Sequence, residues 1–121
     1  MVKSTRILVV DDDTDMRDSV VAMLAAFGME TACADSARAA LAMCVGACPF
    51  DVVLSDVMMP GIDGVQFAQM LREQHPKVRV ILMTGRDSII DNVIDAGAVP
   101  LVKPFKTQQL KRIIDDALEA T

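Results

Sequence analysis

Side chains that can bind a cation or a phosphoryl group stand directly after four short apolar runs of this sequence. The runs are residues 7–10, followed by Asp11, Asp12 and Asp13; residues 52–55, followed by Asp56; residues 78–83, followed by Thr84 and Gly85; and residues 98–102, followed by Lys103 and Pro104. Carboxylates, a hydroxyl and an ammonium are the groups that position and neutralise a phosphoryl group during its transfer. Such chemistry requires a fold that brings the ends of these runs together.

A fifth run, residues 30–34, completes a set of candidate strands that amphipathic stretches separate. Most of these strands are continuously apolar, which is typical of a parallel sheet covered by helices on both faces. Between the first two strands, one helical face that ends at Gly28 carries Met16, Val20, Met23, Leu24 and Phe27. The other predicted helices are residues 36–45, 64–74, 88–96 and 108–120, with N-caps at Asp35, Asp63, Asp87 and Thr107.

This alternation predicts an α/β fold that repeats a strand–helix unit five times, as a single domain over residues 1–121. Because the crossovers are right-handed, we expect a doubly wound, flavodoxin-like sheet. It has five parallel strands in the order 2-1-3-4-5, with helices on both faces. In this order the first and third strands are neighbours, so Asp11, Asp12 and Asp56 converge at the carboxyl end of the sheet.

Three converging carboxylates repel one another. Two carboxylates about 4 Å apart cost on the order of 4 kcal/mol at an effective dielectric constant near 20, so the cluster calls for a cation or for protonation. Oxygen ligands and a solvent-accessible loop favour Mg²⁺, with Mn²⁺ as a substitute. The sequence therefore predicts a divalent metal site formed by Asp11, Asp12 and Asp56.

A metal-bound carboxylate beside a hydroxyl and an ammonium is suited to phosphoryl transfer. We expect Asp56 to attack an in-line phosphorus atom while Lys103 and Thr84 bind the equatorial oxygens. Gly85 leaves the backbone close to the phosphoryl group. The product is an acyl phosphate, whose oxygens give the Thr84 hydroxyl a partner that we expect it to lack beforehand, so the reaction acts as a switch.

The composition excludes other classes of function. The 121 residues have a formal net charge of −5, which disfavours binding to nucleic acid or to anionic lipid. No apolar run reaches the roughly 18 residues that a membrane span needs, and the N-terminus lacks a signal-peptide core. We therefore expect a cytoplasmic protein with neither nucleic acid nor a membrane as its partner.

These residues resemble those of the receiver domains of two-component response regulators, including the single-domain type of chemotaxis. The matching segments span essentially the whole chain and are residues 7–12 (ILVVDD), 51–64 (DVVLSDVMMPGIDG), 80–85 (VILMTG) and 102–105 (VKPF). The resemblance implies that Asp56 is the phosphoacceptor. It also implies that Asp12, Asp56 and the backbone carbonyl of Met58 bind the metal directly, and that Asp11 holds it through water.

The resemblance further implies a switch hydroxyl at Thr84, a phosphate-binding lysine at Lys103 and a cis bond before Pro104. The implied partner is a sensor histidine kinase or a histidine phosphotransfer protein, with a downstream protein target on the face of the fourth helix, fifth strand and fifth helix. Receiver domains often carry an aromatic residue three positions before the lysine, where this chain has Pro100. Because proline has no rotamer to flip, the usual coupling to the switch hydroxyl does not carry over.

Residues that flank the site also have expected roles. Met58 and Arg86, each two positions after a site residue, are expected to flank the path of the attacking water. Arg17 and Val21 on the first helix are the expected kinase-docking surface. The stripe of Asp87, Asp91 and Asp95 is expected to be a solvated helix face.

Two other classes of function remain open. A phosphatase of the haloacid dehalogenase type also uses an aspartyl nucleophile after a first strand, although its Asp-x-Asp-x-(Thr/Val) motif is not matched because Thr14 follows Asp13 directly. The second of these classes is a protein-binding module that is never phosphorylated. The chain is either a stand-alone regulator or the receiver of a longer protein, and Met1 with its short lead-in leans toward a natural start.

Overall fold

The computed structural model describes residues 5–119 and confirms the predicted fold class. Its five strands form one parallel sheet in the order β2-β1-β3-β4-β5. They are β1 (Arg6–Val10), β2 (Glu30–Ala34), β3 (Val52–Asp56), β4 (Arg79–Thr84) and β5 (Val99–Val102). The central strands β1 and β3 pair in a register that sets Val10 opposite Ser55, so the residues that follow both strands lie at one edge of the sheet.

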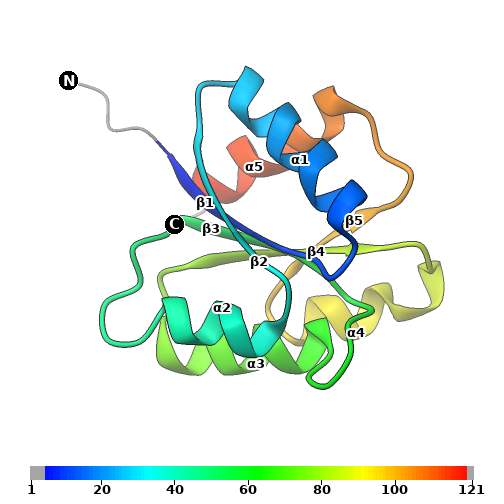
Figure 1. Cartoon of the computed structure of the whole chain (residues 1–121). Helices are drawn as coiled ribbons and strands as arrows, with labels where there is room; N and C mark the ends of the chain where they lie inside the picture. Colours follow the sequence, from blue (N-terminus) through cyan, green and yellow to red (C-terminus); the bar gives the residue numbers. More distant parts are fainter. Residues whose placement is uncertain (1–4, 120–121) are drawn as a thin grey trace.

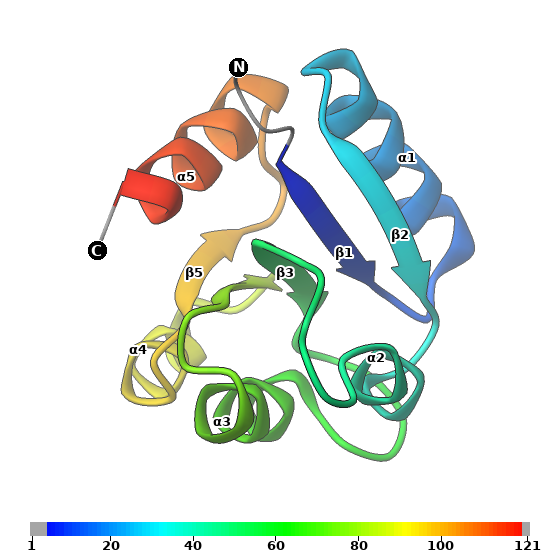
Figure 2. The same ribbon diagram turned by 90° about the vertical axis from the view of Figure 1, so that its left-hand side faces the viewer.

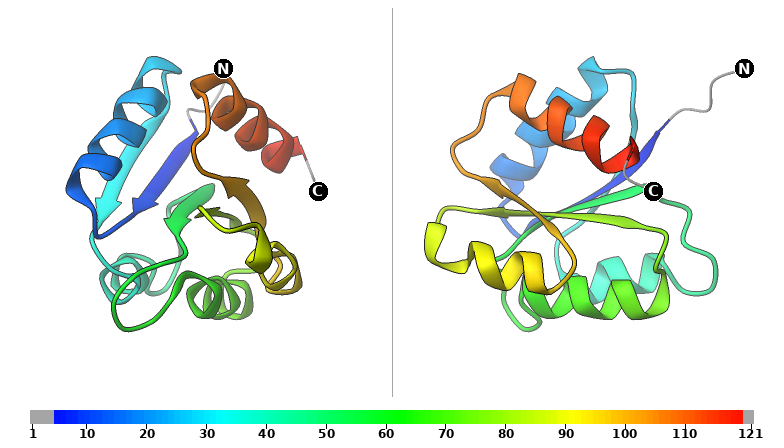
Figure 3. Two further views of the ribbon diagram at one scale, coloured as in Figure 1. Left: turned by 90° about the vertical axis from the view of Figure 1, so that its right-hand side faces the viewer. Right: turned by 180° about the vertical axis from the view of Figure 1, so that it is seen from behind.

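Helices cover both faces of this sheet. They are α1 (Thr14–Ala26), α2 (Ala37–Met43), α3 (Gly64–Gln74), α4 (Ile90–Asp95) and α5 (Thr107–Glu119). α1 and α5 lie on one face and α2, α3 and α4 on the other (Figures 1 and 2). Figure 3 shows the same three layers from two further sides. Among residues 5–119, no helix is long and apolar enough to cross a membrane.

Each face of the sheet has its own buried core, because alternate residues of a strand point to opposite faces. The core beneath α1 and α5 contains Ile7, Val9, Leu54, Val20, Leu24, Leu110 and Ile114. The core beneath α2, α3 and α4 contains Leu8, Val10, Val53, Leu82, Ala40, Phe67, Leu71 and Val93. Packing from both sides holds the strand ends, and with them the site, in fixed positions.

The predicted boundaries are correct for β2 and α3 and shifted elsewhere. β3 extends through Asp56, and β4 begins and ends one residue later than the predicted residues 78–83. α2 is shorter than the predicted residues 36–45 because it ends at Met43. The prediction of a helix over residues 88–96 is wrong in part: a 3-10 turn, η1 (Asp87–Ile89), precedes a short α4. The end of the predicted helix 108–120 lies outside the described residues.

Of the four predicted N-caps, Asp63 is confirmed and the others need correction. Asp63 and Gln66 form a reciprocal capping box at the start of α3. α2 is capped by Ser36, not Asp35, since the Ser36 side chain accepts a hydrogen bond from the Ala39 amide at 3.0 Å. Asp87 caps no helix because it is itself part of η1, and Thr107 is the first residue of α5.

The connection from β3 to α3 folds back tightly beneath Asp56. The Gly64 amide donates a hydrogen bond to the carbonyl of Val57 at 2.9 Å. A Cβ atom at Gly64 would lie 2.6 Å from the backbone oxygen of Asp56 and 2.7 Å from the Cα atom of Val57. Only glycine allows α3 to approach the strand end so closely.

We therefore predict that Gly64→Ala lowers the free energy of unfolding by about 1–3 kcal/mol, because the added methyl group overpacks against backbone. Urea denaturation measures this loss. Gly85→Ala is the matched control, since no heavy atom lies within 4 Å of a Cβ atom there. An equal loss in both variants would contradict the close-approach explanation.

Candidate metal and phosphoryl-binding site

Three carboxylates meet at the carboxyl end of the sheet. Asp11 and Asp12 follow β1, and Asp56 is the last residue of β3. One oxygen from each of these side chains lies within 4.8 Å of the other two. The predicted convergence of these acids is thus present in the structure, and it follows from the adjacency of β1 and β3.

Asp11 is fully buried, and its two carboxylate oxygens differ in their hydrogen bonding. Its Oδ1 accepts a hydrogen bond from the Asp13 amide at 3.0 Å, whereas its buried Oδ2 has no hydrogen-bond partner among residues 5–119. Burial raises the pKa of the Asp11 carboxyl, the Asp13 amide opposes that rise, and the charge of Asp56 adds to it. A buried oxygen without a partner beside two other carboxylates fits a hard divalent cation such as Mg²⁺ or Mn²⁺.

The other residues around the first loop support the cluster without joining it. Asp13 is the N-cap of α1, and its side chain accepts from the amides of Asp15 and Met16. Arg17 donates from Nη1 to the backbone carbonyl of Asp11 at 3.0 Å. The hydrophobic pattern does not predict this contact, although the place of Arg17 in the first turns of the helix after Asp11 is a signal for it.

Lys103 reaches the cluster from β5. Its Nζ atom lies 3.2 Å from Oδ1 of Asp56, with 26% and 13% of the two side chains exposed. The backbone amide of Lys103 donates to the Thr84 carbonyl at 2.7 Å, which ties the ends of β4 and β5 together. The Lys103–Pro104 peptide bond is cis. Only β4 lies between β5 and β3 in the sheet, and the Lys103 side chain crosses the end of that strand to reach Asp56.

Thr84 is buried, and its hydroxyl is already engaged. Oγ1 accepts from the Arg86 amide at 3.0 Å and lies 3.3 Å from the Arg86 carbonyl, to which it donates. The expectation that this hydroxyl lacks a partner is therefore wrong. The reason is local, because the loop turns back within two residues of Thr84 and presents its own backbone groups. A switch at this position has to break these bonds.

A cavity of about 510 Å³ opens beside Thr84, between the start of α3 and the loop before α4. Met58, Gly85 and Arg86 line it together with Ile89 and Asn92. Met58 and Arg86 thus border one open space next to the loop, and a Cβ atom at Gly85 would have no heavy atom of residues 5–119 within 4 Å.

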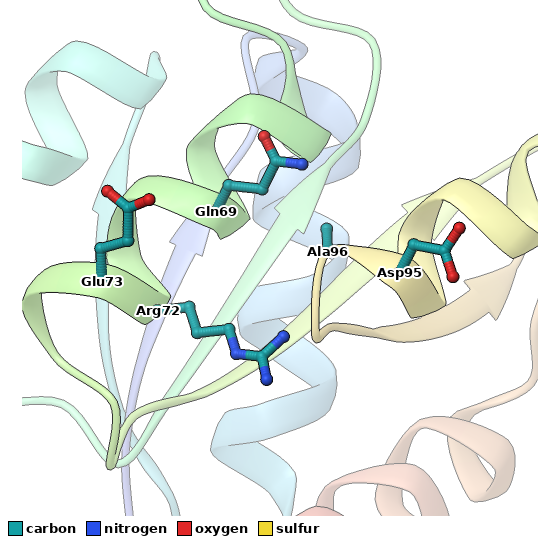
Figure 4. Close-up of a pocket in the computed structure, with 5 residues that line it drawn as sticks. All are labelled: Gln69, Arg72, Glu73, Asp95 and Ala96. Atoms are coloured by element: carbon teal, nitrogen blue, oxygen red, sulfur yellow. The ribbon is translucent and has the colours of Figure 1, made fainter.

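A second cavity, of about 460 Å³, lies between α3 and α4. Its lining is Gln69, Arg72, Glu73, Asp95 and Ala96, whose side chains Figure 4 shows on the two helices. None of the predicted metal or phosphoryl-binding residues contributes to it.

Asp87, Asp91 and Asp95 are exposed, as expected of a solvated stripe.

The remaining predicted position, Pro100, lies in the edge strand β5 opposite Leu82. An edge strand tolerates proline because one of its sides has no pairing partner. Arg17 and Val21, the expected docking residues, are both half-buried on α1.

A doubly wound sheet with an acidic cluster and a facing lysine at its switch point defines a phosphoryl-handling class of α/β domain. The model of the response regulator receiver domain matches residues 7–115. The chain therefore belongs to the response regulator receiver domain family, whose members receive phosphoryl groups from histidine kinases in two-component signalling. This family assignment supports neither the phosphatase nor the binding module that is never phosphorylated.

Known proteins of this family are similar to the chain over nearly all of its length. The regulatory protein AtoC of Escherichia coli is 35% identical over 98% of the chain, and the transcriptional regulatory protein FixJ of Bradyrhizobium diazoefficiens is 34% identical over 98%. The chain spans 26% of the first relative and 58% of the second. One of these longer proteins is named a transcriptional regulatory protein, which does not fit the expectation that nucleic acid is not a partner.

Solved structures agree with the fold. The chemotaxis protein CheY4 of Vibrio cholerae superimposes with a TM-score of 0.87 and 30% identity, covering 96% of this chain and 100% of that one. The receiver domain of NtrX from Brucella abortus gives a TM-score of 0.85 with 35% identity, covering 95% and 99%. The chain is thus similar both to a chemotaxis protein and to a receiver domain of a longer regulator.

The raised pKa of Asp11 leads to a prediction about stability. A group whose pKa is raised by folding contributes stability below its unfolded pKa, here near 3.8, and loses it as the pH rises through the folded pKa. In chelator, Asp11→Asn should therefore unfold at higher urea than the wild type at neutral pH, and the difference should vanish below a pH of about 3.8.

The control is Asp35→Asn, which makes the same chemical change at an exposed acid outside the cluster. Adding Mg²⁺ should stabilise the wild type and reduce the advantage of Asp11→Asn, because a cation that binds the folded state alone shifts the equilibrium toward it. A stability difference that is independent of pH would contradict the assignment.

Proposed function

We propose that Asp56 accepts a phosphoryl group from a phosphohistidine of a sensor histidine kinase or a histidine phosphotransfer protein. The reaction depends on Mg²⁺, for which Mn²⁺ substitutes, and takes place in the cytoplasm. The observation that carries this proposal is the approach of Lys103 Nζ to within 3.2 Å of Asp56 Oδ1, beside two further carboxylates. The chain thus acts as a phosphorylation-controlled switch or relay that also loses its phosphoryl group slowly to water.

Each residue has a definite part in the transfer. A carboxylate oxygen of Asp56 forms the new O–P bond while the N–P bond of the donor breaks and its electron pair returns to the imidazole. Lys103 donates hydrogen bonds to a phosphoryl oxygen and offsets its charge. Asp11 and Asp12, with Asp56 and the backbone carbonyl of Met58, would hold the divalent cation. When bound, this cation neutralises the carboxylates and the phosphoryl oxygens.

The Thr84 hydroxyl is the proposed sensor of the acyl phosphate. To bind a phosphoryl oxygen it leaves the amide and carbonyl of Arg86, so the loop after β4 moves with it. Gly85, which follows Thr84, favours this movement because glycine has the greatest backbone freedom. Since Pro100 has no rotamer to follow the hydroxyl, we propose that loop movement carries the signal to a target on the face of α4, β5 and α5.

The proposed docking surface for the kinase is on α1, near Arg17 and Val21.

The central prediction is that acetyl phosphate labels the wild-type chain in the presence of Mg²⁺, and that Asp56→Asn abolishes labelling. Intact mass spectrometry measures the phosphorylated fraction. Asp13→Asn is the matched control, because this carboxylate caps α1 and lies outside the cluster. Asparagine is also a good N-cap, so labelling should persist. A wild-type chain that remains unlabelled with Mg²⁺ would refute the proposal.

A second prediction concerns the lifetime of the acyl phosphate. Met58 and Arg86 line the cavity beside the loop, so substitutions there should alter the access of water. We expect Met58→Asn and Arg86→Ala each to change the decay rate about threefold to tenfold, which corresponds to a barrier change of up to about 1.4 kcal/mol, while labelling still occurs. Decay is followed after removal of the phosphodonor. Unchanged decay in both variants would exclude this role.

A further inference from the structure

Two cysteine thiols lie in contact near the amino ends of the parallel strands, at the opposite end of the sheet from the carboxylates. The Sγ atoms of Cys44 and Cys48 are 3.2 Å apart, and Cys48 donates a weak hydrogen bond to Cys44. The connection from α2 to β3 that contains them leads into the amino end of β3, whereas the acidic cluster is at the carboxyl ends (Figure 1). The proposed phosphoryl transfer uses neither thiol.

The contact does not arise from helical spacing. A continuing helix would place residues four apart on one face. However, α2 ends at Met43, Cys44 is its C-cap, and Gly46 turns the chain with a φ of 79°. The turn at Gly46, and not a continuing helix, therefore brings the two thiols into contact.

The two thiols differ in access. Cys44 is 1% exposed and belongs to the apolar core beneath α2 and α3. Cys48 is half-buried and lines a cavity of about 280 Å³ together with Asp51, Lys77 and Arg79. Burial, followed by the hydrogen bond with Cys48, raises the pKa of the Cys44 thiol to about 12. Cys48 is therefore the thiol that an external reagent meets first.

The cavity also favours one kind of reagent. Its lining has the two cationic side chains of Lys77 and Arg79 against the single carboxylate of Asp51. The Arg79 Nε atom donates to the Ala117 carbonyl at 3.0 Å, so Lys77 is the cation that faces a reagent first. A small disulfide that carries carboxylates complements this lining. A disulfide bond holds its sulfur atoms about 2.05 Å apart, so the two thiols must approach by only about 1.2 Å to be joined.

We propose that Cys44 and Cys48 form a reversible disulfide by exchange with an anionic low-molecular-weight disulfide. The Cys48 thiolate attacks one sulfur of the reagent, forms a mixed disulfide and releases one thiolate. Cys44 then attacks the Cys48 sulfur and displaces the second thiolate, and the Cys44 proton passes to that leaving group. In total the dithiol loses two electrons and two protons, and the reagent becomes two thiols. Cys33, which is exposed, has no part in this reaction.

The test uses the full chain with Cys33→Ser, so that only the pair remains. The protein is equilibrated with mixtures of reduced and oxidised glutathione, its free thiols are alkylated, and its peptides are mapped by mass spectrometry. We expect a Cys44–Cys48 link and no retained glutathione. Alkylation of both cysteines in the most oxidising mixture, or retained glutathione on Cys48, would overturn the proposal.

Two further measurements test the roles of the thiols and of the fold. With Cys33→Ser, adding Cys44→Ala should leave glutathione on Cys48, whereas adding Cys48→Ala should leave Cys44 unmodified, and the reverse pattern would overturn the assignment. In the Cys33→Ser chain, the equilibrium constant for forming the Cys44–Cys48 disulfide should be on the order of tenfold larger in the native state than in urea. Equal constants in both conditions would show that the native contact of the two thiols does not favour the disulfide, which would overturn the proposal.

Discussion

Repulsion among three carboxylates is the interaction on which the site depends. One oxygen each of Asp11, Asp12 and Asp56 lies within 4.8 Å of the other two, and the buried Oδ2 of Asp11 has no partner in the described part of the chain. At such separations each pair costs on the order of a few kcal/mol. Lys103 offsets one negative charge through Asp56, and the remaining negative charge favours the proposed divalent cation. Under the proposed function, the same repulsion that destabilises the cluster would be relieved by binding that cation.

The fold can hold these charges together because the strands that bear them are packed on both faces. Ile7 and Val9 lie in one core, Leu8 and Val10 lie in the other, and all four side chains are fully buried. Backbone bonds then fix the loops: the Val57 amide donates to the Met83 carbonyl at 3.1 Å, and the Lys103 amide donates to the Thr84 carbonyl at 2.7 Å. The electrostatic cost of the site is thus offset by apolar burial elsewhere in the domain.

The sequence predicted the parts of this structure that depend on hydrophobic pattern, and it failed where short polar contacts decide the outcome. Continuous apolar runs located the strands, and the sheet order followed from the doubly wound topology. Ser36 displaced Asp35 as a cap because one hydroxyl found the Ala39 amide. The Thr84 hydroxyl was expected to be unpaired, yet it bonds to the backbone of Arg86. Such choices differ by about 1 kcal/mol, which pattern alone does not resolve.

Under the proposed function, the engaged Thr84 hydroxyl would also limit how strongly phosphorylation of Asp56 drives the loop after β4. Its bonds to Arg86 are between neutral groups, whereas a bond to a phosphoryl oxygen is charge-assisted. Replacing the neutral bonds by the charge-assisted bond would gain roughly 1 kcal/mol, which changes the ratio of the two loop positions about fivefold. Pro100 would contribute nothing further, because proline has no alternative rotamer. A larger shift therefore needs a second contribution, and the cavity between Met58, Arg86 and Ile89 supplies space in which apolar surface can be buried as the loop closes.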